Sequence, residues 1–278
     1  MKNKLKIGIF DSSIGGISVL KEALKLNLFP EIEYLADTKY YPYGEKDETT
    51  IKERIIKIAD FFQKRENNIL IIACSTASAI YEKHKKEIKN IFKGKIYTML
   101  NRSLCEEITR SSKNKNIGII STSLTAKNGY FKKYIQTRTN NLKITVKAAP
   151  LLIEKITLGK HKSKETYLLA EKYLNPFVKD NDAIVLGCTH FHFTSKIIKK
   201  ICYPKKIIEP APICIKHIMK DLKLQKSLVQ NTNIHFLCTK DLFNFKSQVN
   251  IFFESKKSHL KYSLVQLEKI SDKLSFAV

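Results

Sequence analysis

Short apolar runs alternate along this chain with longer segments in which apolar residues recur every three or four positions. The runs at Leu5–Phe10, Ile32–Ala36 and Ile69–Ala73 have the length of buried strands. The segments between them, Gly16–Leu26 and Thr49–Lys64, carry apolar residues at helical spacing. Because continuous apolar strands are typical of a sheet that crossover helices cover on both faces, the pattern predicts an α/β fold with a mainly parallel sheet.

Parts of this pattern occur twice. Lys6–Ser13 resembles Asn116–Ser123, since both are a strand followed by a small, hydroxyl-rich turn. Ile71–Thr76 resembles Val185–His190, since both are a strand that ends in a small residue, a cysteine and polar residues. Two elements that recur in the same order and at nearly the same spacing predict two similar α/β units. Folds of this class bind ligands beyond the carboxyl ends of their strands, where these turns lie.

Six cysteines occur, and none belongs to a Cys-x-x-Cys pair, which favours free thiols over disulfides. Cys74 and Cys188 stand at equivalent places in the two units, each after an apolar strand and before an expected helix, 77–89 and 193–201. A helix N-terminus lowers the pKa of a thiol, and its free N–H groups bind carboxylates. We therefore predict that these two thiols are functional and that the other cysteines are small buried residues.

Two equivalent thiols suit the inversion of a stereocentre. If the units face each other, one thiolate can remove a proton from a substrate carbon while the opposite thiol returns a proton to the other face. The enantiomers have equal free energy in water, so a nearly symmetric pair serves both directions. A zinc site is disfavoured, because Cys188 and His190 are too close together and Cys74 too isolated for a recognisable ligand spacing. A Cys/His hydrolase would leave the duplication unexplained.

The 278 residues include 50 Lys and Arg against 26 Asp and Glu, a formal net charge of +24. That charge permits attraction to nucleic acid, anionic membranes or acidic metabolites. The lysines are scattered and tryptophan is absent, so we attribute the charge to a general compositional bias and expect neither an aromatic platform for nucleic acid nor a nucleic-acid partner. No apolar run approaches the ~18 residues of a membrane span, and the first apolar stretch is too short for a signal peptide, so we expect a cytoplasmic protein.

Several segments taken together resemble one known family, the glutamate racemases. In chain order they are Asp11–Gly16, Tyr34–Thr38, Pro42–Gly44, Ala73–Ala77 and Leu186–His190, with weaker similarity at Ile208–Ala211 and Leu237–Asp241. The resemblance implies cofactor-independent interconversion of L- and D-glutamate, without pyridoxal phosphate or metal, for bacterial peptidoglycan synthesis. It also implies two α/β domains with the active site in the cleft between them and, as in many members, a homodimer.

The resemblance also implies roles for individual residues. Cys74 and Cys188 would be the paired bases, and Asp11 and His190 would assist them. The residues implied to hold the amino acid are Asp11, Ser12, Tyr43, Gly44, Ser75, Thr76, Thr189 and His190. Because the C-terminal segment of such proteins returns to the first domain, the domains expected here are residues 1–98 plus 210–278, and residues 99–209.

One departure from the family concerns the substrate. Ser75 stands where the family usually has Asn, and serine is shorter and lacks the two amide donors. This leaves two alternatives to a glutamate racemase. One is a racemase of another small acidic amino acid, such as aspartate. The other is a binding protein with a decayed site, although the retained Cys74, Cys188 and His190 argue against decay.

Other departures concern the turns and an assisting carboxylate. Ser13 replaces a usual Gly, which strains the turn if that position has a positive φ. Gly15 is interpreted as turn chemistry alone. The family has a Glu that assists near the second cysteine, and alignment without gaps puts Thr157 there while Glu154 lies one turn away. The sequence assigns that role to neither residue.

Overall fold

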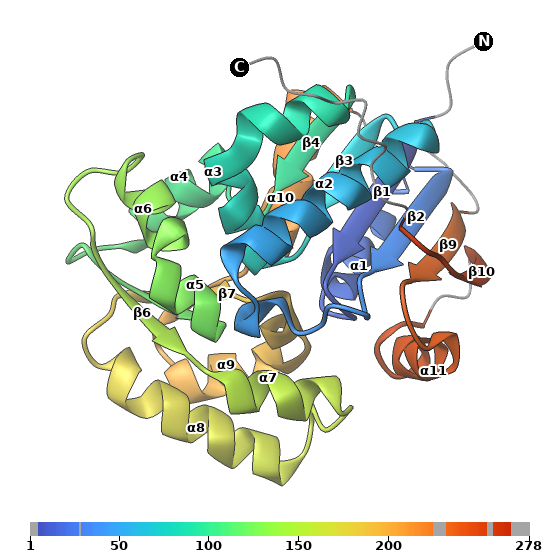
Figure 1. Cartoon of the computed structure of the whole chain (residues 1–278). Coiled ribbons are helices and arrows are strands. Elements are labelled where there is room, and N and C mark those ends of the chain that lie inside the picture. The colour runs from blue at the N-terminus through green and yellow to red at the C-terminus, as the bar shows by residue number, and fades with distance from the viewer. Residues whose placement is uncertain (1–4, 28, 225–231, 255–257, 268–278) are drawn as a thin grey trace.

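Two parallel sheets form the framework of the molecule (Figure 1). The computed structural model describes residues 5–27, 29–224, 232–254 and 258–267. Within them, the larger sheet has the order β10-β9-β2-β1-β3-β4 and the smaller has the order β6-β5-β7-β8, with every pair parallel. The larger sheet contains β1 (Lys6–Asp11), β2 (Glu31–Ala36), β3 (Ile69–Ile72), β4 (Lys95–Thr98), β9 (Thr232–Cys238) and β10 (Ser258–Leu264). The smaller contains β5 (Asn116–Ser121), β6 (Lys143–Ala148), β7 (Ala183–Gly187) and β8 (Lys206–Ile208).

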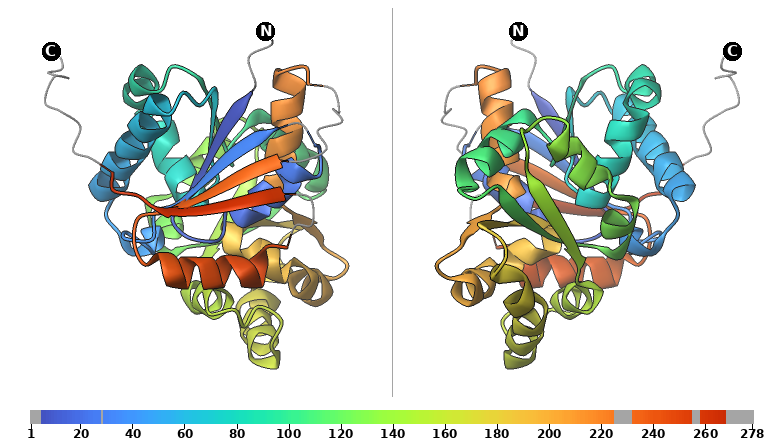
Figure 2. Two further views of the ribbon diagram at one scale, coloured as in Figure 1. Left: turned by 90° about the vertical axis from the view of Figure 1, so that its right-hand side faces the viewer. Right: turned by 90° about the vertical axis from the view of Figure 1, so that its left-hand side faces the viewer.

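The predicted duplication is present in the strand order. The series β2-β1-β3-β4 of the first unit has the same succession as β6-β5-β7-β8 of the second. The strands β9 and β10 extend the larger sheet beyond β2, as Figure 2 shows at its orange and red edge. The expectation of an α/β fold with two similar parallel units is therefore confirmed. The domain limits expected at residues 98 and 209 stay a prediction.

Helices cover the faces of both sheets. Those in and around the larger sheet are α1 (Ile17–Leu24), α2 (Glu48–Lys64), α3 (Ser75–Ile91), α10 (Pro210–Asp221) and α11 (Leu242–Phe252). The helices that lie between β4 and β8 along the chain are α4 (Arg102–Ser111), α5 (Ser123–Asn128), α6 (Tyr130–Gln136), α7 (Pro150–Thr157), α8 (Lys164–Val178) and α9 (Ser195–Cys202). Short 3-10 turns are η1 (Tyr43–Glu45) and η2 (Thr189–Thr194). No helix in the described ranges is long and apolar enough to cross a membrane.

The two units also pack alike. Gly8 in β1 lies against the ring of Phe62 from α2, where an added Cβ would be 2.6 Å from a ring carbon. Gly118 occupies the equivalent place in β5 and lies against the ring of Phe177 from α8, at 2.5 Å. Each repeated glycine thus lets a covering helix insert an aromatic ring against the central strand. The sequence repeat is therefore also a repeat in the packing of helix on sheet.

Candidate active site

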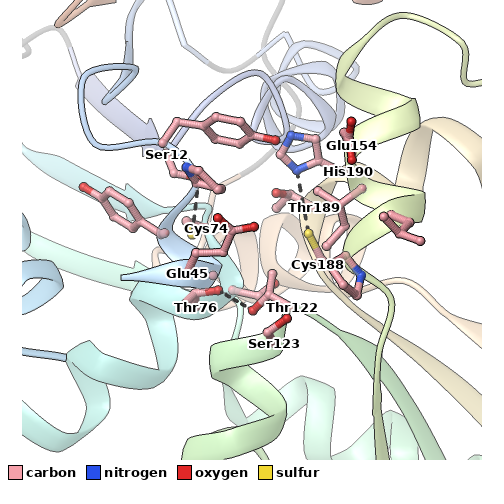
Figure 3. Close-up of a pocket in the computed structure, with 18 residues that line it drawn as sticks. Ser12, Glu45, Cys74, Thr76, Thr122, Ser123, Glu154, Cys188, Thr189 and His190 are labelled. Atoms are coloured by element: carbon pink, nitrogen blue, oxygen red, sulfur yellow. Dashed lines mark hydrogen bonds between the residues drawn. The ribbon is translucent and has the colours of Figure 1, made fainter. Parts of the chain in front are cut away.

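A pocket of about 240 Å³ lies between the two units, where the carboxyl ends of both sheets converge (Figure 3). The segments after β1, β2 and β3 form one side, and those after β5, β6 and β7 form the other. The sequence-predicted residues that line it are Ser12, Tyr43, Gly44, Cys74, Ser75, Thr76, Cys188, Thr189 and His190. Asp11, the remaining predicted residue, is not among the lining residues. The repeat thus brings its two turns to one cavity.

Cys74 and Cys188 reach this pocket from equivalent positions. Cys74 is the N-cap of α3, directly beyond β3, and Cys188 precedes η2, directly beyond β7. Figure 3 shows the two cysteines on either side of the pocket, one from each unit. Their side chains are nearly buried, since the residues are 6% and 5% exposed. The helix expected at 193–201 begins at Ser195, and the 3-10 turn Thr189–Thr194 takes the place after Cys188.

The expectation that the thiols have low pKa values is wrong, because burial outweighs the effect of the N-termini. Burial raises the pKa of Cys74 to about 12, and it raises the pKa of Cys188 well above the usual range. Hydrogen bonds from backbone N–H groups, such as those of Ala77 to Cys74 and of His190 to Cys188, lower the pKa by less than burial raises it. The charge of Asp11 raises the pKa of both thiols further. Both cysteines are therefore protonated at neutral pH in this structure.

The two thiols have different polar partners. The Cys74 thiol points to Ser12 Oγ at 4.0 Å, and Cys188 Sγ lies 3.7 Å from His190 Nδ1. Burial lowers the pKa of His190 to about 4, so its imidazole is neutral at physiological pH. His190 Nε2 is buried and has no hydrogen-bond partner among the described residues. A neutral imidazole can exchange a proton with Cys188 through Nδ1.

Asp11 lies behind the pocket and joins the two units. Its carboxylate accepts a hydrogen bond at 3.0 Å from the Ser13 backbone N–H, and another at 3.0 Å from Thr189 Oγ1 of the second unit. It also accepts one at 3.4 Å from Ser12 Oγ. Burial raises the pKa of Asp11 to about 6, although these hydrogen bonds lower it. Asp11 therefore orients Thr189 directly and acts on both thiols through its charge.

We expect Asp11→Asn to stabilise the protein above pH 6. The raised folded-state pKa means that the fold favours the protonated group, so this stability is full below the ordinary value of 3.8 and is lost as the pH rises through about 6. A permanently neutral asparagine avoids that loss, which amounts to about 3 kcal/mol. Urea unfolding at pH 5 and pH 8 measures the effect. A variant less stable than the native chain at pH 8 contradicts the prediction.

A buried charge network fixes the loop that carries Tyr43. The Tyr43 hydroxyl donates to Asp37 Oδ2 at 2.6 Å, and Arg54 pairs with the same carboxylate at 2.8 and 3.0 Å. Thr239 Oγ1 donates to Asp37 Oδ1 at 2.8 Å. This network gives a structural role to two of the segments that resemble the family but carry no proposed catalytic residue. Asp37, in the first segment, anchors the loop, and Thr239, in the second, bonds the end of β9 to Asp37.

Two glycines allow the units to approach closely. A Cβ at Gly15 would lie 2.3 Å from Thr189 Oγ1 and 2.7 Å from His190 Nδ1. A Cβ at Gly44 would lie 2.7 Å from Cβ of Thr122. The interpretation of Gly15 as turn chemistry alone is therefore wrong, since its lack of a side chain makes room for the second unit.

Ser13 does not have a positive φ, so the serine that stands at this position in place of the family's usual glycine does not strain the turn.

Sequence reasoning missed several residues of the pocket. The additional lining residues are Tyr41, Pro42, Glu45, Thr122, Ser123, Pro150, Leu151, Ile153 and Glu154. The repeat could have found Thr122, because it corresponds to Ser12 in the alignment of the two units. Of the two candidates for the family's assisting carboxylate position, Glu154 lines the pocket, whereas the Thr157 hydroxyl contacts the Tyr41 hydroxyl.

The pocket lacks cationic side chains, despite the charge of +24. Of its described lining residues none is Lys or Arg, and two, Glu45 and Glu154, are acidic. A carboxylate ligand must therefore be held by neutral donors, namely hydroxyl groups and the backbone N–H groups at the starts of α3 and η2. No three His, Cys, Asp or Glu side chains are grouped to hold a metal ion in the described part of the chain.

Known proteins resemble this chain over nearly its whole length. No family model matches it. It is 30% identical over 277 residues to the glutamate racemase of Carboxydothermus hydrogenoformans, and the alignment covers 97% of each chain. A glutamate racemase of Bacillus anthracis superimposes with a TM-score of 0.84, at 22% identity, over 96% of this chain and 99% of that one. The glutamate racemase of Francisella tularensis, solved in complex with D-glutamate, gives a TM-score of 0.81 at 26% identity, over 95% and 98% of the two chains. With this identity and coverage, the chain belongs to the glutamate racemase family.

Proposed function

We propose that this glutamate racemase works without a cofactor, by moving protons between Cys74, the substrate Cα and Cys188. The observation that carries the proposal is that two repeated units each deliver one thiol to the same pocket. A base on one side of Cα and an acid on the other are what inversion requires. The neutral donors around the pocket suit an amino acid with two carboxylates.

In the proposed reaction one cysteine is a thiolate and the other a thiol. The thiolate takes the Cα proton, and the electron pair left on Cα passes into the substrate's carboxylate. The opposite thiol then gives its proton to the other face of Cα, so the product has inverted configuration and the two cysteines have exchanged their states. Since burial holds the pKa of both thiols high, one proton must leave for solvent before the reaction starts. His190 Nδ1 is within reach of that proton on Cys188 and would relay it, because the lowered pKa of His190 keeps the imidazole from retaining it.

The substrate contacts are proposed from the lining residues. Ser12, Tyr43 and Gly44 would hold one end of glutamate, together with the N-termini after Cys74 and Cys188. The complex of the Francisella tularensis protein with D-glutamate supports an acidic amino acid as ligand. We also propose that the product supplies peptidoglycan synthesis, that the domains are residues 1–98 plus 210–278 and residues 99–209, and that the protein forms a homodimer.

The decisive test follows L-glutamate by circular dichroism with purified protein and no added cofactor. We expect the signal to decay to zero, since the two enantiomers are equally populated at equilibrium. In deuterium oxide, the D-glutamate formed should carry deuterium at Cα, because the incoming proton comes from a cysteine that exchanges with solvent. Aspartate and glutamine serve as comparison substrates. A constant signal without Cα exchange refutes the proposal. A faster reaction with aspartate would identify aspartate, and not glutamate, as the preferred substrate.

A further inference from the structure

A hydrogen bond joins the two units at the edge of the pocket. Tyr41, in the segment after β2, lines the pocket, and its hydroxyl lies 2.9 Å from Thr157 Oγ1 at the end of α7. The Thr157 hydroxyl also lies 2.9 Å from the Ile153 carbonyl, to which it donates. A threonine hydroxyl has one proton, so Tyr41 must be the donor between the two hydroxyls. Tyr41 of the first unit therefore donates a hydrogen bond to Thr157 of the second, whose hydroxyl is held in place by its own bond to Ile153.

Tyr41 also packs beside a residue of the proposed mechanism. Its ring centroid is 6.1 Å from that of the His190 imidazole, with the planes inclined by 36°. Burial raises the pKa of Tyr41 to about 12, so its hydroxyl stays protonated across the neutral range. The Tyr41 side chain thus covers His190 on the side of the first unit while its hydroxyl is held by Thr157.

Cys74 and Cys188 line the pocket but are only 6% and 5% exposed, so movement of the units apart would make their sulfurs more accessible. We propose that the Tyr41–Thr157 pair is a clasp that holds the two units closed over the pocket, and that Tyr41 is a positioning residue for His190. Tyr130 of the second unit also bonds to Lys83 and Glu48 of the first, at 2.6 and 2.7 Å and outside the pocket lining. The bond of Thr76 with Thr122, at 3.0 Å, involves a residue proposed to bind substrate. Neither Tyr41 nor Thr157 has such a role, so the clasp can be changed separately.

The first experiment measures opening without using catalysis. Cysteine alkylation is followed residue by residue with mass spectrometry in Tyr41→Phe, Thr157→Val and the double variant. The loss of one net hydrogen bond shifts the equilibrium between the closed and opened arrangements of the units about three- to tenfold, so Cys74 and Cys188 should react faster by that factor. The double variant should react no faster than either single one, because each removes the same bond. Cys202 and Cys214, buried away from the pocket, should keep their rates, which separates opening of the pocket from general destabilisation.

Two matched controls isolate the bond. Thr157→Ser keeps the hydroxyl and should restore native alkylation rates, whereas Thr157→Val keeps the shape alone. Tyr40→Phe removes the neighbouring tyrosine hydroxyl, and the Tyr40 ring lies 4.1 Å from the Arg54 guanidinium and outside the pocket lining. This variant should also react as the native protein does.

The second experiment rests on the proposed function. With L- or D-glutamate, kcat/KM should fall about three- to tenfold in Tyr41→Phe and in Thr157→Val, equally in both directions because the equilibrium constant is one. Unchanged alkylation of Cys74 and Cys188 in Tyr41→Phe overturns the clasp, as do effects that multiply in the double variant. If alkylation responds as expected while every variant and the native protein leave glutamate unchanged, the clasp stands and the proposed function fails.

Discussion

Replacing either Cys74 or Cys188 with alanine is expected to lower racemisation of glutamate by about a thousandfold or more. General acid–base groups contribute roughly 10²- to 10⁴-fold each, and the proposed reaction needs one such group on each face of Cα in both directions. Neither thiol can substitute for the other, because the two enter the pocket from different units. The measurement is the rate at which the circular dichroism of L-glutamate decays.

Proton exchange distinguishes the two variants. In Cys74→Ala the remaining Cys188 can still remove and return a proton on its own face of Cα, so one enantiomer should exchange its Cα proton in deuterium oxide without inversion. In Cys188→Ala the opposite enantiomer should exchange. This pattern assigns each cysteine to one face of the substrate. Loss of racemisation through misfolding would abolish both exchange reactions and would not give opposite preferences.

Cys202→Ala is the matched control for these variants. Cys202 is fully buried in α9 and is not part of the pocket lining, so its replacement should leave the rate within about twofold. Racemisation that persists in both Cys74→Ala and Cys188→Ala rules out the two-thiol mechanism.

Much of this site could be predicted from the sequence because the repeat carries topological information. Two copies of a strand followed by a Cys-containing turn are sufficient to predict two parallel units, and parallel strands put their carboxyl ends on one edge. Cys74 and Cys188 therefore reach the ligand-binding edge whatever the details of the loops. The helix limits expected from apolar spacing agree with α2 and α3 to within two residues.

The features that the sequence did not predict depend on how the units contact each other. The high pKa of Cys74 follows from its burial between the units, which outweighs the effect of the local helix N-terminus. The partner of Asp11 in the second unit is Thr189, far away along the chain, and no local pattern encodes that contact. Which of Thr157 and Glu154 faces the pocket likewise depends on the orientation of α7 toward the first unit.

The second large effect is expected for Gly15→Ala. The new methyl group would overlap Thr189 Oγ1 and His190 Nδ1, neither of which belongs to the first unit. The side chains of Thr189 and His190, or the second unit that carries them, must then shift, which disturbs the bond from Thr189 to Asp11 and the contact of His190 with Cys188. A displacement of about 1 Å at reacting groups costs on the order of a hundredfold in rate, so we expect kcat/KM for glutamate to fall by about that factor.

Stability should change much less than catalysis in this variant, because the overlap lies at the junction of two units and not inside either core. Overpacking by one methyl group typically costs about 1–3 kcal/mol, which urea unfolding can measure. Ser13→Ala is the matched control in the same turn, since it adds no atom, and it should retain the native rate. If Gly15→Ala also retains the native rate, the reacting state does not hold Thr189 and His190 against this turn. The closed contact between the units would then belong to the resting protein alone, and Asp11 could not act through Thr189 during the reaction.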